Sequence, residues 1–84
     1  MYFLYILKST KKDWNYIGVT ANLERRILDH NTGSVRSTKA FRPFLLIHKE
    51  EFSDKKLARK REIFLKKTAR ARKEIFNNFK GLIV

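Results

Sequence analysis

The sequence contains no cysteine, which excludes disulfide bonds, thiolate zinc sites and cysteine nucleophiles together. It also contains no apolar run near the roughly 20 residues that a membrane-spanning helix needs. The apolar segment at residues 1–7 lacks a basic lead-in and is too short for the apolar region of a secretory signal. Two histidines are too few for a histidine cage around a metal. From these absences we expect a soluble, cytoplasmic protein without a membrane partner.

Acidic residues are scarce. Eight Asp and Glu residues stand against 20 Lys and Arg residues, so the net charge is +12 and the pI is near 10.4. Such a surplus on a small surface creates a potential that attracts polyanions. From Lys55 to Lys73 the chain is rich in Lys and Arg and carries one acid, Glu62. This pattern favours a nucleic acid as the partner, DNA first and RNA as an open alternative, over an acidic protein surface.

Aromatic residues are plentiful: seven Phe, three Tyr and one Trp supply bulk for the core of one domain over residues 1–84. The hydrophobic pattern and the turn and cap residues predict six elements in the order β-β-α-β-α-α. This order predicts an α+β fold, with a three-stranded, mostly antiparallel sheet flanked by helices. The predicted elements are strands at 2–7 and 14–20, a helix from Asn22 to Gly33, a strand at 44–52, and helices that begin near Asp54 and Thr68, with a basic loop at 34–42.

The last two predicted helices are basic, so their buried faces rest on few apolar positions. A period of 3.6 residues predicts that Leu57, Ala58, Phe64 and Leu65 form the buried arc of the first of them. Arg61 falls inside this arc, which predicts a buried stem or an ion pair. In the final helix the same period points four apolar side chains inward, and the helix is expected to end at Gly81. These four are Ala71, Ile75, Phe76 and Phe79.

The stretch from Tyr16 to His30 reads as a strand end, a turn and a helix whose Arg26 and His30 share one face. In an antiparallel strand pair, the hydroxyls of Tyr5 and Tyr16 can emerge at one sheet edge beside that face. A phenol beside cations can act as a base because its phenolate is favoured. Arg26 can clamp a phosphate, and His30 can orient a tyrosine hydroxyl or relay its proton. The alternative is two core tyrosines with satisfied hydroxyls and one solvated arginine.

Glu62 needs an explanation because it is the one acid in a basic stretch. One explanation is an ordinary helical ion pair with a neighbouring Lys or Arg, which contributes about 0.3–0.5 kcal/mol. The other is a carboxylate ligand for a single Mg²⁺ or Mn²⁺ ion, completed by waters and phosphate oxygens. The sequence leaves both open.

Together these residues resemble the GIY-YIG nuclease family, in particular its small single-domain bacterial members of the excinuclease-subunit-C-like type. Phe3-Leu4-Tyr5 stands at the first motif, of which the tyrosine matches, and Tyr16-Ile17-Gly18 matches the second motif in full. The resemblance extends from Met1 to about Arg70. Val19 stands where some relatives carry a lysine. The family's later positions fall on Arg26, on His30, on Glu62 as the metal-binding glutamate, and on Asn77 or Asn78 as the late asparagine.

The resemblance implies a repair or recombination endonuclease that hydrolyses DNA phosphodiester bonds by a one-metal mechanism. Tyr5 or Tyr16 would activate the attacking water, Arg26 would stabilise the pentacovalent phosphate, and Glu62 would hold Mg²⁺ or Mn²⁺. Two other hypotheses remain: a nucleic-acid-binding module that has the fold without turnover, and a subunit that docks on a larger repair complex. Phosphate contacts are expected from five basic side chains, Arg25, Arg36, Lys39, Arg42 and Arg61.

Overall fold

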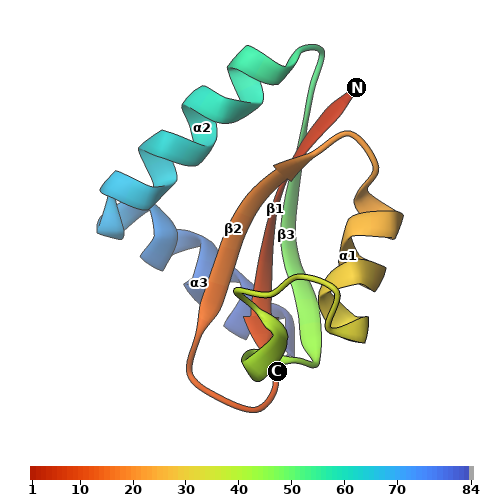
Figure 1. Ribbon diagram of the computed structural model, residues 1–84. Coiled ribbons are helices and arrows are strands. Elements are labelled where there is room, and N and C mark those ends of the chain that lie inside the picture. Colours follow the sequence, from red (N-terminus) through yellow and green to blue (C-terminus); the bar gives the residue numbers. More distant parts are fainter. Residues whose placement is uncertain (84) are drawn as a thin grey trace.

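The structure is a computed structural model that describes residues 1–83 and, for side chains, residues 1–78. The predicted order β-β-α-β-α-α and the α+β class are confirmed, with the sheet lying between α1 on one side and α2 with α3 on the other (Figure 1). One short element was not predicted, a 3-10 helix inside the basic loop. The elements are β1 (Tyr2–Ser9), β2 (Asn15–Thr20), α1 (Leu23–Thr32), η1 (Lys39–Phe41), β3 (Phe44–Phe52), α2 (Lys55–Lys67) and α3 (Ala69–Ile83).

The sheet has the order β2-β1-β3, and both strand pairs are antiparallel. The hairpin register places Tyr5 opposite Gly18 and Leu7 opposite Tyr16. Directly opposed residues point to the same face of a sheet, so this register brings Tyr5, Leu7 and Tyr16 to one face. Because β1 is central, β2 is an edge strand, and its outer side faces no other strand of the sheet.

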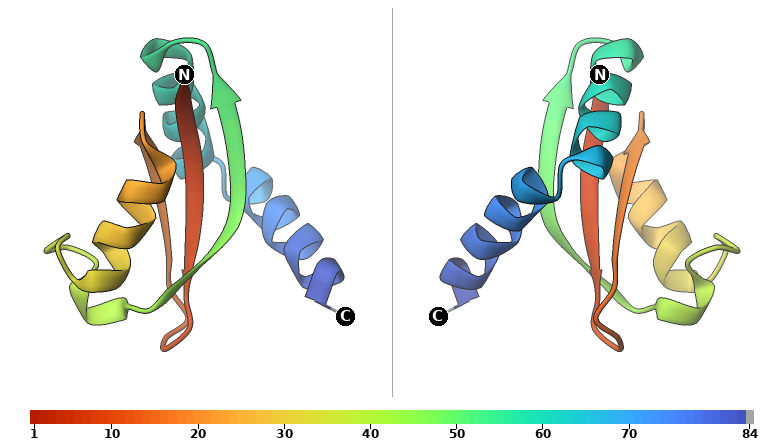
Figure 2. Two further views of the ribbon diagram at one scale, coloured as in Figure 1. Left: turned by 90° about the vertical axis from the view of Figure 1, so that its right-hand side faces the viewer. Right: turned by 90° about the vertical axis from the view of Figure 1, so that its left-hand side faces the viewer.

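The two faces of the sheet are covered by different layers, which Figure 2 shows from both sides. On the face toward α1, Tyr5 and Leu7 pack with Phe44. On the face toward α2 and α3, Leu4 and Ile6 pack with an apolar cluster. The predicted alternation of β2 is confirmed, since Trp14 and Tyr16 join the first cluster and Ile17 and Val19 join the second.

Helix α1 is fixed at both ends, which sets the direction of its functional face. The Asn22 side chain accepts a hydrogen bond from the Arg25 amide at 3.1 Å, as expected of a helix cap. At the other end Gly33 has φ 84°, and its amide bonds to the carbonyls of Asp29 and His30. Glycine adopts this left-handed conformation without steric cost, so the predicted end of the helix is confirmed.

The buried stripe of α2 differs from the predicted arc. Ala58 and Leu65 are fully buried as expected, but Leu57 is 45% exposed and Phe64 is 47% exposed. The helix is turned so that positions 58, 61, 62 and 65 face the sheet, which is the spacing of one helical stripe. The prediction was wrong for Leu57 and Phe64 because it counted apolar side chains and gave no weight to charged residues that contact the sheet.

Arg61 explains part of this rotation, and the predicted ion pair is confirmed. Its Nε lies 2.9 Å from Oε1 of Glu50 on β3, and its Nη2 lies 3.2 Å from Oε2. His48 adds a contact of 2.7 Å to the same carboxylate. Burial by itself would raise the pKa of Glu50, but the hydrogen bonds and charges of Arg61 and His48 outweigh it and lower the pKa. This carboxylate therefore stays ionised and anchors α2 to β3.

Helix α3 covers the lower part of the same face. Ala71, Ile75 and Phe76 pack against the aliphatic cluster, as predicted. The expected end at Gly81 is wrong, because α3 continues to Ile83. The predicted inward position of Phe79 lies outside the residues whose side chains are described.

Candidate active site at the edge strand

Three ring side chains from three elements meet on the face of the sheet that α1 covers. Tyr5 comes from β1, Tyr16 from β2 and His30 from α1. The ring centroids of Tyr5 and Tyr16 are 6.1 Å apart, and the His30 ring lies 5.8 Å from the first and 4.9 Å from the second. Residues 25 positions apart in the chain therefore form one cluster, as the sequence predicted.

Gly18 makes room for this cluster. A Cβ atom at this position would lie 2.5 Å from the Tyr5 hydroxyl oxygen, 2.7 Å from its Cζ and 2.9 Å from Cε2 of Tyr16. Real Cβ atoms do not approach other atoms so closely, so any larger residue would displace both rings. The glycine of the Tyr-Ile-Gly motif thus lets the Tyr5 hydroxyl lie directly against β2.

His30 is fully buried and makes a hydrogen bond through each ring nitrogen. Nε2 lies 2.9 Å from the Tyr5 hydroxyl, and Nδ1 lies 2.8 Å from Oγ1 of Thr38. The Thr38 hydroxyl donates to the Val35 carbonyl at 3.3 Å, so it accepts from Nδ1–H and leaves Nε2 to accept from Tyr5. Burial, and to a smaller extent the charge of Arg26, lower the pKa of His30 to about 4. The ring is therefore neutral near pH 7.

Thr38 is the participant that the sequence analysis missed. It is fully buried and lies in the segment expected to be a basic loop, directly before η1. A buried histidine needs a partner at each ring nitrogen, and this rule could have indicated that a second hydroxyl was required. The rule could not distinguish Thr38 from the neighbouring hydroxyl residues, Thr32, Ser34 and Ser37.

Arg26 lies with the two phenols. Its pKa is raised chiefly by hydrogen bonding with Tyr5, and Tyr16 contributes in the same direction. For Tyr5, burial raises the pKa to about 12, although hydrogen bonding with Arg26 acts to lower it. The sequence analysis expected nearby cations to favour the phenolate. At Tyr5 burial outweighs them, so its hydroxyl keeps its proton near neutral pH.

Glu62 lies on α2, which packs on the face of the sheet opposite to the phenols. Its side chain is 12% exposed, with Oε2 3.2 Å from Nζ of Lys66 and Oε1 3.9 Å from Nη1 of Arg59. The predicted helical ion pairs are therefore present. The Glu62 charge is also one of the smaller causes that raise the pKa of Tyr5. The charge of Glu62 therefore acts on Tyr5, although more weakly than burial and Arg26 do.

The five basic candidates for phosphate contact differ in how they are engaged. Two are held by acids: Arg25 pairs with Asp29 at 3.2 Å, and Arg61 with Glu50 on the far face. Arg42 donates from Nη1 to the Thr32 carbonyl at 3.0 Å.

Arg36 and Lys39 are the other two candidates. Both are exposed, and neither forms an ion pair with any side chain in residues 1–78. Asn77 and Asn78 are exposed on α3, which lies on the face away from the phenols. Of these four residues, Arg36 and Lys39 therefore lie nearer in the fold to the ring cluster, since their loop contains Thr38.

Comparison with known proteins identifies the family. The family model of the GIY-YIG catalytic domain matches residues 1–75. The chain belongs to the GIY-YIG family. This GIY-YIG chain is 38% identical over 76 residues to the UPF0213 protein YazA of Bacillus subtilis, covering 89% of this chain and 76% of that protein. It is 40% identical over 73 residues to a UPF0213 protein of Staphylococcus haemolyticus, with 86% and 88% covered.

A solved structure agrees with this assignment. The solution NMR structure of a UPF0213 protein of Bacillus halodurans matches with a TM-score of 0.56 and 31% sequence identity, covering 95% of this chain and 85% of that one. The GIY-YIG domain places the chain in a nuclease family, for which nucleic acid is the substrate and a divalent metal is typical. Among residues 1–83 no helix has the length and apolar character needed to cross a membrane.

The donor atoms of this GIY-YIG domain fit a metal bound through a single carboxylate. Within the described residues no group of three His, Asp or Glu side chains gathers, so no cage of protein ligands is formed there. Mg²⁺ commonly keeps several waters and binds through one or two carboxylates together with substrate phosphates. Glu62 offers such a carboxylate, and its two present partners, Arg59 and Lys66, have side chains that are more than half exposed.

Proposed function

We propose that this GIY-YIG domain is a metal-dependent endonuclease that hydrolyses DNA phosphodiester bonds at the outer edge of β2. The observation that carries the proposal is the cluster of Tyr5, Tyr16 and His30 at β2. Arg26 lies beside both phenols, and the charge of Glu62 acts on Tyr5. A guanidinium binds the oxygens of a phosphate through two parallel hydrogen bonds. A phosphate bound by Arg26 would therefore lie beside Tyr16 and within the field of Glu62.

The two tyrosines take different roles in this proposal. Tyr5 is 1% exposed, donates its hydroxyl proton to His30 and has a pKa of about 12, so it is a poor base. It serves as a positioning residue that holds Arg26. Tyr16 is partly exposed on the edge strand, where a water molecule can reach its hydroxyl. Because its hydroxyl lies on the accessible edge strand beside Arg26, Tyr16 is the general base of the proposal.

Arg26 and Glu62 act on the charge of the phosphate. Negative charge grows on the phosphate oxygens as water attacks, and a preorganised cation such as Arg26 typically contributes about 10²- to 10³-fold in rate. Glu62 would hold the divalent ion. When bound, such an ion supplies positive charge that polarises the phosphate and stabilises the leaving oxygen. Lys66 would then be released from Glu62 and left free for a neighbouring phosphate.

Binding to the DNA backbone is proposed to come from the exposed cations of the loop before β3. Arg36 and Lys39 lie on either side of Thr38, whose hydrogen bond to His30 fixes this loop to the site. With a net charge of +12, affinity should fall steeply as salt rises, because counterions are released on binding. Residues 1–83 contain no separate element for reading bases in a groove, so we propose a repair or recombination nuclease with weak sequence preference.

A second candidate function has one specific observation in its favour. Glu62 is paired with two cations, Lys66 and Arg59, which is also the arrangement expected of a purely structural acid. This arrangement fits a nucleic-acid-binding module, or a subunit of a repair complex, that does not cleave. The two functions differ in whether the Glu62 carboxylate is needed for turnover.

The test uses supercoiled plasmid and branched DNA with Mg²⁺, with Mn²⁺ or with EDTA. We expect wild-type protein to nick DNA only with metal, and Glu62→Gln to lose about 10²-fold or more of this activity while binding DNA normally. Glu74→Gln is the matched control, since Glu74 is an exposed acid on α3. Equal binding without metal-dependent nicking by wild type and Glu62→Gln would refute the nuclease and favour the module.

A further inference from the structure

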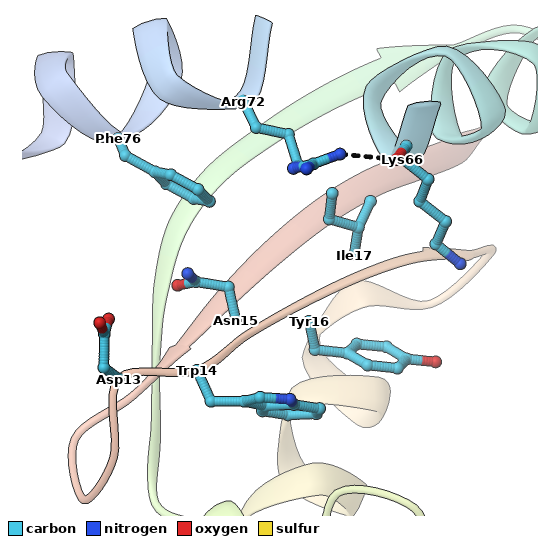
Figure 3. A pocket seen from close by; sticks show the side chains of 8 residues that line it. All are labelled: Asp13, Trp14, Asn15, Tyr16, Ile17, Lys66, Arg72 and Phe76. Atoms are coloured by element: carbon cyan, nitrogen blue, oxygen red, sulfur yellow. Dashed lines mark hydrogen bonds between the residues drawn. The ribbon is translucent and has the colours of Figure 1, made fainter. Parts of the chain in front are cut away.

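The outer edge of β2 borders a hollow of about 420 Å³ that the proposed chemistry does not use (Figure 3). It lies between β2, the end of α2 and the start of α3. Ile17 and Phe76 form apolar walls, and Arg72 and Lys66 stand at the side of α2. Its volume is within the range of about 300–1,000 Å³ that is usual for small-ligand sites.

Asn15 borders this hollow, and its side-chain oxygen is a hydrogen-bond acceptor without a donor. Its Oδ1 is buried and has no hydrogen-bond partner, and it is the one buried side-chain polar atom of this kind in the described part of the chain. Figure 3 shows the Asn15 side chain on the α3 side of β2, turned toward Phe76 and away from Tyr16. A buried acceptor without a donor costs free energy, so such atoms call for an explanation. A ligand that brings an N–H donor to Asn15 would remove this cost.

Arg72 forms a rigid, planar border to the hollow. Its Nη1 donates to the carbonyls of Leu65 at 2.7 Å and Lys66 at 2.6 Å, which are unsatisfied acceptors in the last turn of α2. The guanidinium is therefore held in one place. Figure 3 shows the Arg72 guanidinium and the Phe76 ring, both from α3, at the border of the same hollow. A planar cation and an aromatic ring are both groups on which flat molecules stack.

Lys66 links the hollow to the proposed catalytic site. Its side chain borders the hollow, and its Nζ contacts Glu62 at 3.2 Å. Tyr16 also borders the hollow from the other side of β2. A ligand in the hollow would therefore lie next to a phosphate bound at the site, separated from it by the width of one strand.

We infer that this hollow accepts one unstacked nucleobase of the substrate strand, beside the phosphate to be cleaved. The inference rests on the proposed function. A nucleobase has a flat face for Phe76 and Arg72, N–H groups on its edge for Asn15, and an attached phosphate for Lys66. In a duplex the base edges are paired and the faces are stacked, so the base must come from a single strand or be flipped out.

The experiment measures DNA affinity without metal, by fluorescence anisotropy on short labelled single strands. One strand carries abasic sites at every position, and the other differs by one central adenine, so both have the same phosphates. Adenine is chosen because an asparagine amide can pair with its edge through two hydrogen bonds. We expect the single base to tighten binding by about tenfold, the order expected for stacking of one base on an aromatic side chain.

Variants locate where the base binds. Asn15→Leu keeps the branched shape of the side chain and removes its acceptor, and Phe76→Ala removes the stacking wall. Both should lose most of the gain from the single adenine while still binding the abasic strand. Phe64→Ala is the matched control, because Phe64 is an exposed aromatic residue of α2 that does not border the hollow. It should keep the full gain.

The outcomes separate this inference from the proposed function. Equal affinity for the two strands, or a gain that survives in both Asn15→Leu and Phe76→Ala, overturns the base site and leaves the nuclease untouched. If Phe76→Ala fails to fold, Asn15→Leu decides alone. A base-dependent gain in a protein that does not nick DNA supports the site and rejects the nuclease. If neither strand binds, the base site is overturned, and the nuclease is still decided by the nicking assay on plasmid and branched DNA.

Discussion

The two faces of the sheet differ in kind, although the same three strands make both. Toward α1, the aromatic rings of Tyr5 and Tyr16 meet a buried histidine through polar contacts. Toward α2 and α3, Leu4, Ile6 and Leu65 form an aliphatic cluster without polar contacts between them. Because side chains alternate along a strand, four successive residues of β1, Leu4 to Leu7, supply one face for chemistry and one for stability. Activity and folding should therefore respond to different substitutions.

The largest effect is expected from Arg26→Ala on the α1 face. This change removes the cation that lies with both phenols, so nicking by the folded protein should fall by about 10²- to 10³-fold. Its thermal unfolding should change little, since Arg26 is only partly buried. Arg70→Ala, at an exposed arginine of α3, serves as the control for lost charge. An Arg26→Ala protein that cleaves at the wild-type rate would contradict the claim that the α1 face carries the activity.

The opposite response is expected from Leu65→Ala on the aliphatic face. Leu65 is fully buried, so the cavity should lower the free energy of unfolding by about 2–5 kcal/mol, measured by urea denaturation. The rate of nicking per folded molecule should stay near wild type. Leu57→Ala removes the same atoms from a side chain that is 45% exposed, and it should cost much less. Equal losses in the two variants would contradict the observed rotation of α2.

These two predictions depend on which residues face α1 and which face α2 and α3, and the sequence predicted this only in part. The period-2 alternation of Trp14 to Val19 assigned both faces of β2 correctly, because a strand on a two-sided core has no other way to bury alternate residues. The same kind of reasoning failed for α2. There Arg61 faces the sheet and pairs with Glu50, and this contact joins residues from different elements, which local periodicity does not register.

The candidate site shows the same limit. The spacing of Arg26 and His30 on one helix face, and the gathering of Tyr5 with Tyr16, were visible in the sequence. The hydrogen bond from His30 to Thr38 was not, since it depends on how the loop before β3 folds back on α1. The raised pKa of Tyr5 was likewise not predictable, because it follows from the depth of burial and not from residue types.

The pH dependence of stability tests the buried histidine. Above pH 6.5 the His30 ring is neutral in both the folded and the unfolded state, so it does not lower the free energy of unfolding. As the pH falls from 6.5 toward 4, His30 becomes protonated in the unfolded chain but stays neutral in the folded protein. The free energy of unfolding therefore declines by on the order of 3 kcal/mol. Urea unfolding of wild type and His30→Gln across this range should give a flatter profile for the variant. Parallel profiles would show that His30 is not the group responsible.

The smallest effect is expected from Thr38→Val, which keeps the side-chain shape and removes one hydroxyl. The Nδ1–H of His30 would lose its buried acceptor, at a cost of about 1–3 kcal/mol in unfolding free energy. Nitrogen NMR of the His30 ring shows which of its two nitrogens carries the proton. In wild type we expect the proton on Nδ1, and in Thr38→Val a mixture of tautomers. A variant with an unchanged ring spectrum would remove Thr38 from its positioning role.

The central claim is that a carboxylate from the α2 layer and the phenols of the α1 layer act on one phosphate across β2. The most direct measurement is NMR line broadening by Mn²⁺ in the presence of a DNA strand with non-hydrolysable linkages. The account predicts metal-dependent broadening of the resonances of both Glu62 and Tyr16, and its loss in Glu62→Gln. Broadening confined to other parts of the surface, or identical broadening in Glu62→Gln, would contradict it.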